Sequence, residues 1–154
     1  MRILVDADSC PRAARDLVAR AAQRLGIVAV FAANRSLPGI TGDHIVMEIC
    51  PATDGAADDR LAELAGPGDL AICRDLPLAK RLLGKGAAVI DDRGRAFSAD
   101  NIDELISIRD FAVGLAENGL GVERTAGYGR RESKAFADAL DRQLRRLTAG
   151  KRDG

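Results

Sequence analysis

Residues 3–11 read Ile-Leu-Val-Asp-Ala-Asp-Ser-Cys-Pro, and this stretch decides the fold. Its apolar start predicts a short buried strand, and Pro11 is typical of the first turn of a helix. Asp6 and Asp8 then lie at the carboxyl end of a strand, where open α/β sheets bind their ligands. Capping of the helix accounts for one carboxylate and not for two. A pair of carboxylates at one strand end repels unless a proton, a cationic side chain or a metal intervenes.

Strands and helices alternate along the rest of the chain. This alternation predicts an α/β fold of three layers, a mostly parallel five-stranded sheet flanked by helices. If the first strand is central, the sheet changes direction between the first and fourth strands, and the crevice there is the expected binding site. We expect one domain over residues 1–150 and a frayed tail at 151–154. After the first strand, strands are predicted at 27–33, 45–49, 69–73 and 87–90, and helices at 12–25, 56–65, 76–83, 101–117 and 132–147.

Composition narrows the classes of protein. The 154 residues include 23 Lys plus Arg and 23 Asp plus Glu, so the net charge is zero, which argues against binding nucleic acid by bulk charge. With one Tyr and no Trp, stacking on bases is not the main binding mode. The three cysteines have no zinc-type spacing, and no run is apolar enough to cross a membrane. With no leader before the first strand, the sequence predicts a cytoplasmic protein without membrane contact.

Further carboxylates are expected at the same edge of the sheet. Asp75 follows the fourth strand as Asp6 follows the first, and Asp58 lies in the first turn of a short helix. Clustered carboxylates suit Mg²⁺ or Mn²⁺, which prefer oxygen ligands. His44 is the only histidine, so a histidine-based zinc site is not expected. Asp91 and Asp92 end the fifth strand and resemble a turn more than a ligand pair.

The chain resembles the bacterial YaiI/YqxD family. The resemblance covers nearly the whole chain in the same order. It rests on Val5–Pro11, Ala33-Asn34, Ala57-Asp58, Gly68-Asp69-Leu70, the run 74–79, Arg93-Gly94, Asn101-Ile102 and Arg109-Asp110-Phe111.

The resemblance implies a PIN-like fold of the kind that includes the NYN nucleases, in which clustered aspartates bind Mg²⁺ or Mn²⁺ for phosphodiester hydrolysis. It implies metal ligands at Asp6, Asp8, Asp58 and Asp75, and catalytic roles for Asp6, Asp8 and Asp75. Thr53-Asp54-Gly55 departs from the family's Gly-x-Asp pattern, and Asp54 is left out of the predicted site. The predicted substrate contacts are Ser9, Cys10, Arg12, Asn34 and Arg74.

These features favour a metal-dependent nuclease acting on RNA, and three alternatives stay open. A phosphatase of the haloacid dehalogenase type would also use Asp-x-Asp after the first strand, but Gly68-Asp69 begins a strand instead of ending one. A binding module would hold nucleic acid or nucleotide without catalysis. Thiol chemistry at Cys10 is disfavoured by the neighbouring carboxylates.

The oligomeric state stays open, with a homodimer among the options. The cations considered as guides for a strand of RNA are Arg12, Arg15, Arg74, Lys80, Arg81, Arg130, Arg131 and Lys134.

Overall fold

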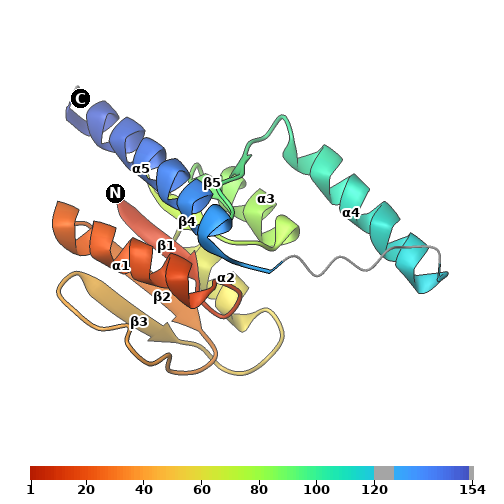
Figure 1. Ribbon diagram of the computed structural model, residues 1–154, viewed down its shortest axis with the longest axis horizontal. Helices are drawn as coiled ribbons and strands as arrows, with labels where there is room; N and C mark the ends of the chain where they lie inside the picture. The colour runs from red at the N-terminus through yellow and green to blue at the C-terminus, as the bar shows by residue number, and fades with distance from the viewer. Residues whose placement is uncertain (120–126, 153–154) are drawn as a thin grey trace.

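The protein is a three-layer α/β structure, as the sequence predicts (Figure 1). The computed structural model describes residues 1–119 and 127–152. Within these ranges, no helix is long and apolar enough to cross a membrane. The elements are β1 (Arg2–Asp6), α1 (Arg12–Leu25), β2 (Val28–Ala33), β3 (Ile45–Ile49), α2 (Ala56–Leu64), β4 (Leu70–Ile72), α3 (Leu76–Gly84), β5 (Ala88–Ile90), β6 (Ala96–Phe97), α4 (Ile102–Glu117) and α5 (Arg130–Arg152).

The sheet has six strands in the order β3-β2-β1-β4-β5-β6. The first five are parallel, and β6 pairs antiparallel with β5. The prediction of five strands was therefore one strand short, because β6 has only two residues and shows no alternating pattern. Since β1 lies between β2 and β4, the change of direction falls beside β1, as expected.

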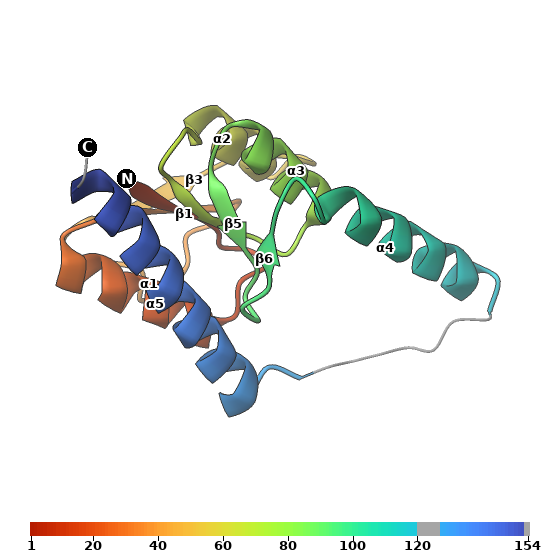
Figure 2. The ribbon, with the colours of Figure 1, turned by 90° about the horizontal axis from the view of Figure 1, so that it is seen from above.

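Helices cover both faces of the sheet. Helices α1 and α5 lie side by side on one face, and α2 and α3 lie on the other (Figures 1 and 2). Alternate residues of β1 enter the two cores: Ile3 and Val5 pack under α1 and α5, and Leu4 packs under α2 and α3. Both sides of a parallel strand are then buried, which explains the continuous apolar run.

The ends of two helices differ in how well the sequence predicts them. Helix α1 has the predicted bounds and ends at Gly26, whose φ of 65° suits glycine and whose N–H donates to the Ala22 carbonyl. Helix α5 continues through Arg152, so residues 151–152 are helical where a frayed tail is predicted. Residues 153–154 lie outside the described residues, as do residues 120–126 of the glycine-rich segment Gly119–Gly129, which separates the last two predicted helices.

Helix α4 extends away from the rest of the molecule (Figures 1 and 2). Its first turn is anchored by Ile102, which is buried against the side of α3. Further along, Ile108, Phe111 and Val113 are exposed by 58%, 70% and 48%. The described part of α4 therefore leaves apolar side chains in solvent along its outer half.

Candidate metal and phosphate site

The site begins in the loop that follows β1. Asp6 is the last residue of β1 and is only 8% exposed, and Ser9 Oγ donates to Asp6 Oδ2 at 2.9 Å. Burial, chiefly, raises the pKa of Asp6 to about 6; the charges of Asp58, Asp8 and Asp75 raise it too, and the Ser9 hydrogen bond opposes them. A carboxyl group with this pKa exchanges its proton near neutral pH.

Asp8 is exposed and lies against the end of β2. The backbone N–H of Asn34 donates to Asp8 Oδ2 at 2.8 Å. With its amide nitrogen oriented toward Asp8, the Asn34 side chain lies 3.3 Å from both carboxylate oxygens. Asn34 therefore holds Asp8 in place; it also lines one cavity with Asp8, and its contact with substrate stays a prediction.

Asp58 comes from the first turn of α2 and is half-buried. Burial raises the pKa of Asp58, the charge of Asp75 raises it further, and Arg81 lowers it. Asp6, Asp8 and Asp58 line one cavity of about 320 Å³ between the loop after β1 and the loop before α2. The structure thus brings together three of the four predicted ligands.

Asp75 lies at the start of α3 and is close enough to Asp58 to raise its pKa, which burial raises most. Its Oδ1 accepts the Leu78 N–H at 2.9 Å and caps the helix, so one of its two oxygens has a structural role. Asp75 does not line the 320 Å³ cavity. Its charge nevertheless raises the pKa of both Asp6 and Asp58, so it belongs to the same electrostatic cluster.

Arg74 and Cys10 lie behind this cluster. Arg74 forms an ion pair with Asp92, whose side chain is 3% exposed. Cys10 is buried, and burial raises the pKa of its thiol to about 12, so the thiol stays protonated and unreactive near neutral pH. Both residues share a small cavity with Asp6 and Asp92. They support the floor of the site from below, and neither faces the larger cavity.

The predicted cations separate into two groups. Several are paired with carboxylates on the surface: Lys80 with Asp103, Arg81 with Asp59, and Lys134 with Asp138. Others have no ion pair among the described residues: Arg12 at the start of α1, and Arg130 and Arg131 at the start of α5, all exposed.

The type of donor atom in this cluster suits a metal ion, but the spacing of the side chains suits one less well. Among residues 1–119 and 127–152, no group of three or more His, Cys, Asp or Glu side chains is placed to hold a metal ion directly. The donors are all carboxylate oxygens, which suit Mg²⁺ or Mn²⁺, and such ions keep several waters and take few protein ligands. The donor chemistry therefore suits such an ion, whereas the spacing of the described side chains does not by itself form a metal site.

Two residues near the site were not predicted as part of it. Asp92 is 2% exposed, and its Oδ1 has no hydrogen-bond partner among the residues that the structure describes. The only sequence signal for Asp92 was the Asp91-Asp92 doublet at the end of the fifth predicted strand. Asp91 is the member that forms the turn, because it accepts hydrogen bonds from the N–H groups of Arg93 and Arg95. Asp54 lines the cavity from the loop before α2, although it was left out because it departs from the family pattern.

The comparisons with known proteins agree on one family. The model of the family described as "Uncharacterized BCR, YaiI/YqxD family" matches residues 4–146. A UPF0178 protein of Treponema pallidum (strain Nichols) is 45% identical over 147 residues, covering 96% of this chain and 83% of the relative. A UPF0178 protein of Treponema denticola is also 45% identical, covering 94% and 92%. One of Pseudomonas putida (strain W619) is 41% identical, covering 97% and 100%. No solved structure matches the chain. The chain therefore belongs to the YaiI/YqxD family of uncharacterised proteins.

Proposed function

We propose that this protein is a Mg²⁺- or Mn²⁺-dependent nuclease that cleaves phosphodiester bonds, with RNA as the favoured substrate. The observation that carries the proposal is that Asp6, Asp8 and Asp58 line one cavity at the carboxyl edge of the sheet. Burial raises the pKa of Asp6, and the charges of Asp58, Asp8 and Asp75 raise it further. A cluster of this kind is costly unless a cation or protons compensate its charge. The preference for RNA depends on the family resemblance alone.

The proposed ligands are Asp6, Asp8 and Asp58, with Asp75 contributing through its second carboxylate oxygen. When bound there, a divalent ion would lower the pKa of a water molecule and stabilise negative charge on a phosphate. Ser9 fixes the orientation of Asp6, and Asn34 fixes that of Asp8. These contacts keep the carboxylates in place before substrate arrives, which is the arrangement that efficient catalysis needs.

The hydrolytic step needs a base and a group that orients the attacking water. A carboxylate of the cluster would accept a proton from the attacking water. Asp8 and Asp75 are exposed at the same edge and can hydrogen-bond to the water. Oxygen of the water bonds to phosphorus, the bond to the leaving oxygen breaks, a proton of the water passes to a carboxylate, and the leaving oxygen takes a proton from solvent. Arg12, which is exposed at the start of α1, would contact a phosphate oxygen.

A phosphatase of the haloacid dehalogenase type is disfavoured by the position of Asp69. This residue precedes β4, at the opposite end of the strand from Asp75. Asp69 is 5% exposed and accepts hydrogen bonds from the backbone N–H groups of Arg2 (2.9 Å) and Gly66 (3.0 Å). Its role is structural, and it is not placed to serve the site.

The test is cleavage of end-labelled single-stranded and hairpin RNA by the purified protein with Mn²⁺, Mg²⁺ or EDTA. We expect cutting that needs the metal and that falls at least 100-fold in Asp8→Asn and in Asp75→Asn. Asp16→Asn, which removes an exposed carboxylate from α1, is the matched control and should cut normally. Cutting that survives EDTA or both substitutions would contradict the proposal. RNA that is retained and not cut would instead favour a binding module.

A further inference from the structure

A groove between α1 and α5 opens at the same end of the molecule as the carboxylate cluster. Its volume is about 420 Å³, in the range of small-molecule sites. Ala13, Leu17 and Ala137 form its apolar floor, and Tyr128 lies at one end. Nothing in the proposed hydrolytic step uses this groove.

The groove is connected to the site through Tyr128. The Tyr128 hydroxyl donates to the backbone carbonyl of Asp92 at 2.8 Å, and Asp92 shares a small cavity with Asp6. The Arg93 guanidinium lies over the Tyr128 ring, 5.9 Å from its centre. Tyr128 is thus held by the turn after β5, the strand end next to the site. The groove and the site are therefore both supported by the turn that follows β5.

The rim of the groove is basic. Arg130 and Lys134 line it, and the exposed Arg12 and Arg131 lie at the starts of the same two helices. Lys134 is paired with Asp138, but such an exposed pair one helical turn apart contributes little and leaves the lysine available. The first turn of α1 has no acidic residue, so the positive end of its helix dipole adds to this charge.

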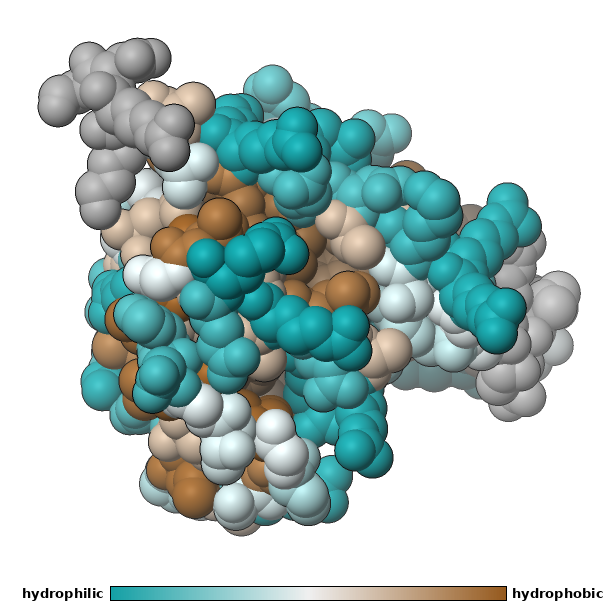
Figure 3. Space-filling model, turned by 60° about the vertical axis from the view of Figure 1, so that its left-hand side comes forward, coloured by the Kyte–Doolittle hydropathy of each residue, from teal (hydrophilic) through white to brown (hydrophobic). Residues whose placement is uncertain are grey.

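A negative cluster beside a positive groove suits a chain of repeating phosphates. One phosphate would lie at the metal-binding carboxylates, and its neighbours would meet the cations of the groove. The apolar floor and the Tyr128 ring offer a surface for a base, in the manner of grooves that bind single strands. Figure 3 shows one face of the molecule, on which hydrophilic residues are interspersed with smaller apolar areas.

We infer that the groove between α1 and α5 binds a single-stranded polynucleotide next to the bond that is cleaved. The inference depends on the proposed function for the position of that bond, whereas binding in the groove needs neither metal nor cleavage. The shared chemistry is a phosphodiester chain, RNA or DNA. A chain that spans groove and site is held by several phosphates, so a dinucleotide should bind much more weakly than a longer strand.

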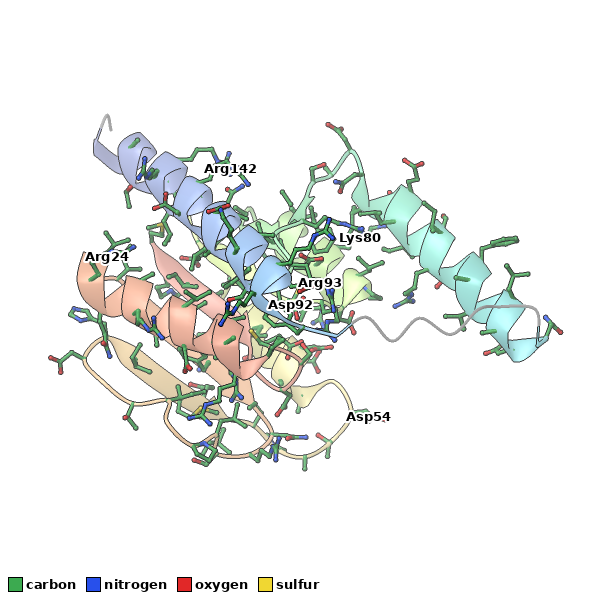
Figure 4. The ribbon with its side chains drawn as sticks, viewed as in Figure 1. Arg24, Asp54, Lys80, Asp92, Arg93 and Arg142 are labelled. Atoms are coloured by element: carbon green, nitrogen blue, oxygen red, sulfur yellow. The ribbon has the colours of Figure 1, made fainter. Side chains whose placement is uncertain are left out.

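The experiment is fluorescence anisotropy in EDTA with a labelled 12-nucleotide RNA, the DNA of the same sequence and a labelled dinucleotide. The test variant is Arg130→Glu with Lys134→Glu. The control is Arg24→Glu with Arg142→Glu, which changes the net charge equally. Figure 4 shows Arg24 and Arg142 away from the first turn of α5, where Asp92 and Arg93 lie. Thermal unfolding checks that both variants fold.

We expect the test variant to bind the 12-mer at least 10-fold more weakly and the control to stay within about 2-fold of the wild type. Loss of two phosphate contacts should also reduce the slope of log affinity against log salt by about 1.4. Equal weakening in both variants, no weakening in either, or no binding by the wild type would overturn the inference. The DNA strand tells whether the sugar matters.

A second measurement does not depend on the folding of a variant. RNA that carries 4-thiouridine is cross-linked to the wild-type protein by light, and the labelled peptides are identified. Cross-links within residues 13–17 or 127–137 support the groove, and cross-links confined to other parts of the chain contradict it. If RNA binds in the groove and is never cut, the nuclease proposal is wrong and the inference that the groove binds RNA is supported. If the test variant cuts RNA normally and binds it with unchanged affinity, the inference about the groove is wrong and the nuclease proposal is supported.

Discussion

Asp6 contributes instability to the fold when no cation is bound. Its pKa is about 6 in the folded protein against an ordinary 3.8, so its ionised form is disfavoured by folding. Two pKa units correspond to about 3 kcal/mol, and the free energy of unfolding is lower by this whole amount at pH values above 6. As the pH falls through 6 toward 3.8, the folded protein takes up the proton first and the penalty disappears. A residue kept at this cost is better explained by a site than by the fold.

Asp6→Asn should therefore stabilise the metal-free protein. At pH 7.5 in EDTA we expect an increase of about 1–3 kcal/mol in the free energy of unfolding, and most of this increase should be absent at pH 4.5. Urea unfolding at the two pH values measures it. Asp16→Asn, at an exposed position of α1, should change the stability little at either pH. A destabilised Asp6→Asn protein at pH 7.5 would show that the ionised carboxylate is compensated within the fold.

The candidate site is predictable where backbone position alone decides it. Asp6 and Asp75 follow strands, and Asp58 begins a helix, so the sequence placed them at one edge of the sheet. The burial of Asp92 was not predictable, because either member of the Asp91-Asp92 doublet could have turned inward. Its partner, Arg74, is 18 residues away in the chain and meets it only when β4 and β5 pair. The same holds for the contact of Asn34 with Asp8, which needs β1 beside β2.

The turn between β5 and β6 is the element that joins α5 to the site. Gly94 in this turn has a φ of 90°, and a Cβ added there would lie 2.6 Å from the Ala135 carbonyl oxygen of α5. The backbone of the turn therefore touches the helix directly. Tyr128 and Arg93 hold the same junction from the side.

Gly94→Ala should destabilise the protein more than Gly68→Ala. Gly68 has a similar φ of 87° with nothing within 4 Å of an added Cβ, so its substitution costs only backbone strain, about 1–2 kcal/mol. At Gly94 the helix must also move, which adds at least about 1 kcal/mol. Urea unfolding of the two variants gives the comparison. Equal losses would contradict the close packing of α5 on the turn.

At the scale of elements, the sequence predicts the bounds of a helix with local end signals better than it predicts a short strand that is defined by its pairing. The helical repeat and Gly26 gave the bounds of α1, because periodicity and a glycine stop are local signals. Strand β6 was not predicted, because Ala96–Phe97 is defined by its pairing with β5 and has no sequence pattern of its own. The prediction of α5 began two residues late and ended five residues early, since its basic ends lack an apolar stripe.

For the molecule as a whole, α4 is the part least supported by the core. Phe111 is 70% exposed, so Phe111→Ser should change the free energy of unfolding by less than about 0.5 kcal/mol. Ile102→Ala, at the buried start of the same helix, should cost about 2–4 kcal/mol. Chemical unfolding at two protein concentrations measures both. A loss at Phe111 above about 1 kcal/mol that grows with concentration would mean that another chain covers this side chain in solution.

The central position of β1 has a consequence for how the chain reaches its fold during synthesis. Ile3 pairs with Ala29 on one side and with Leu70 on the other, so the middle strand of the sheet is made early and completed late. At ribosomal rates of about 5–20 residues per second, the second neighbour of β1 arrives roughly 3–13 s after the strand itself. Through that interval one edge of an Ile-Leu-Val segment has no partner strand. The order of strands along the chain thus sets a period in which the nascent protein depends on the ribosome or on chaperones to avoid association.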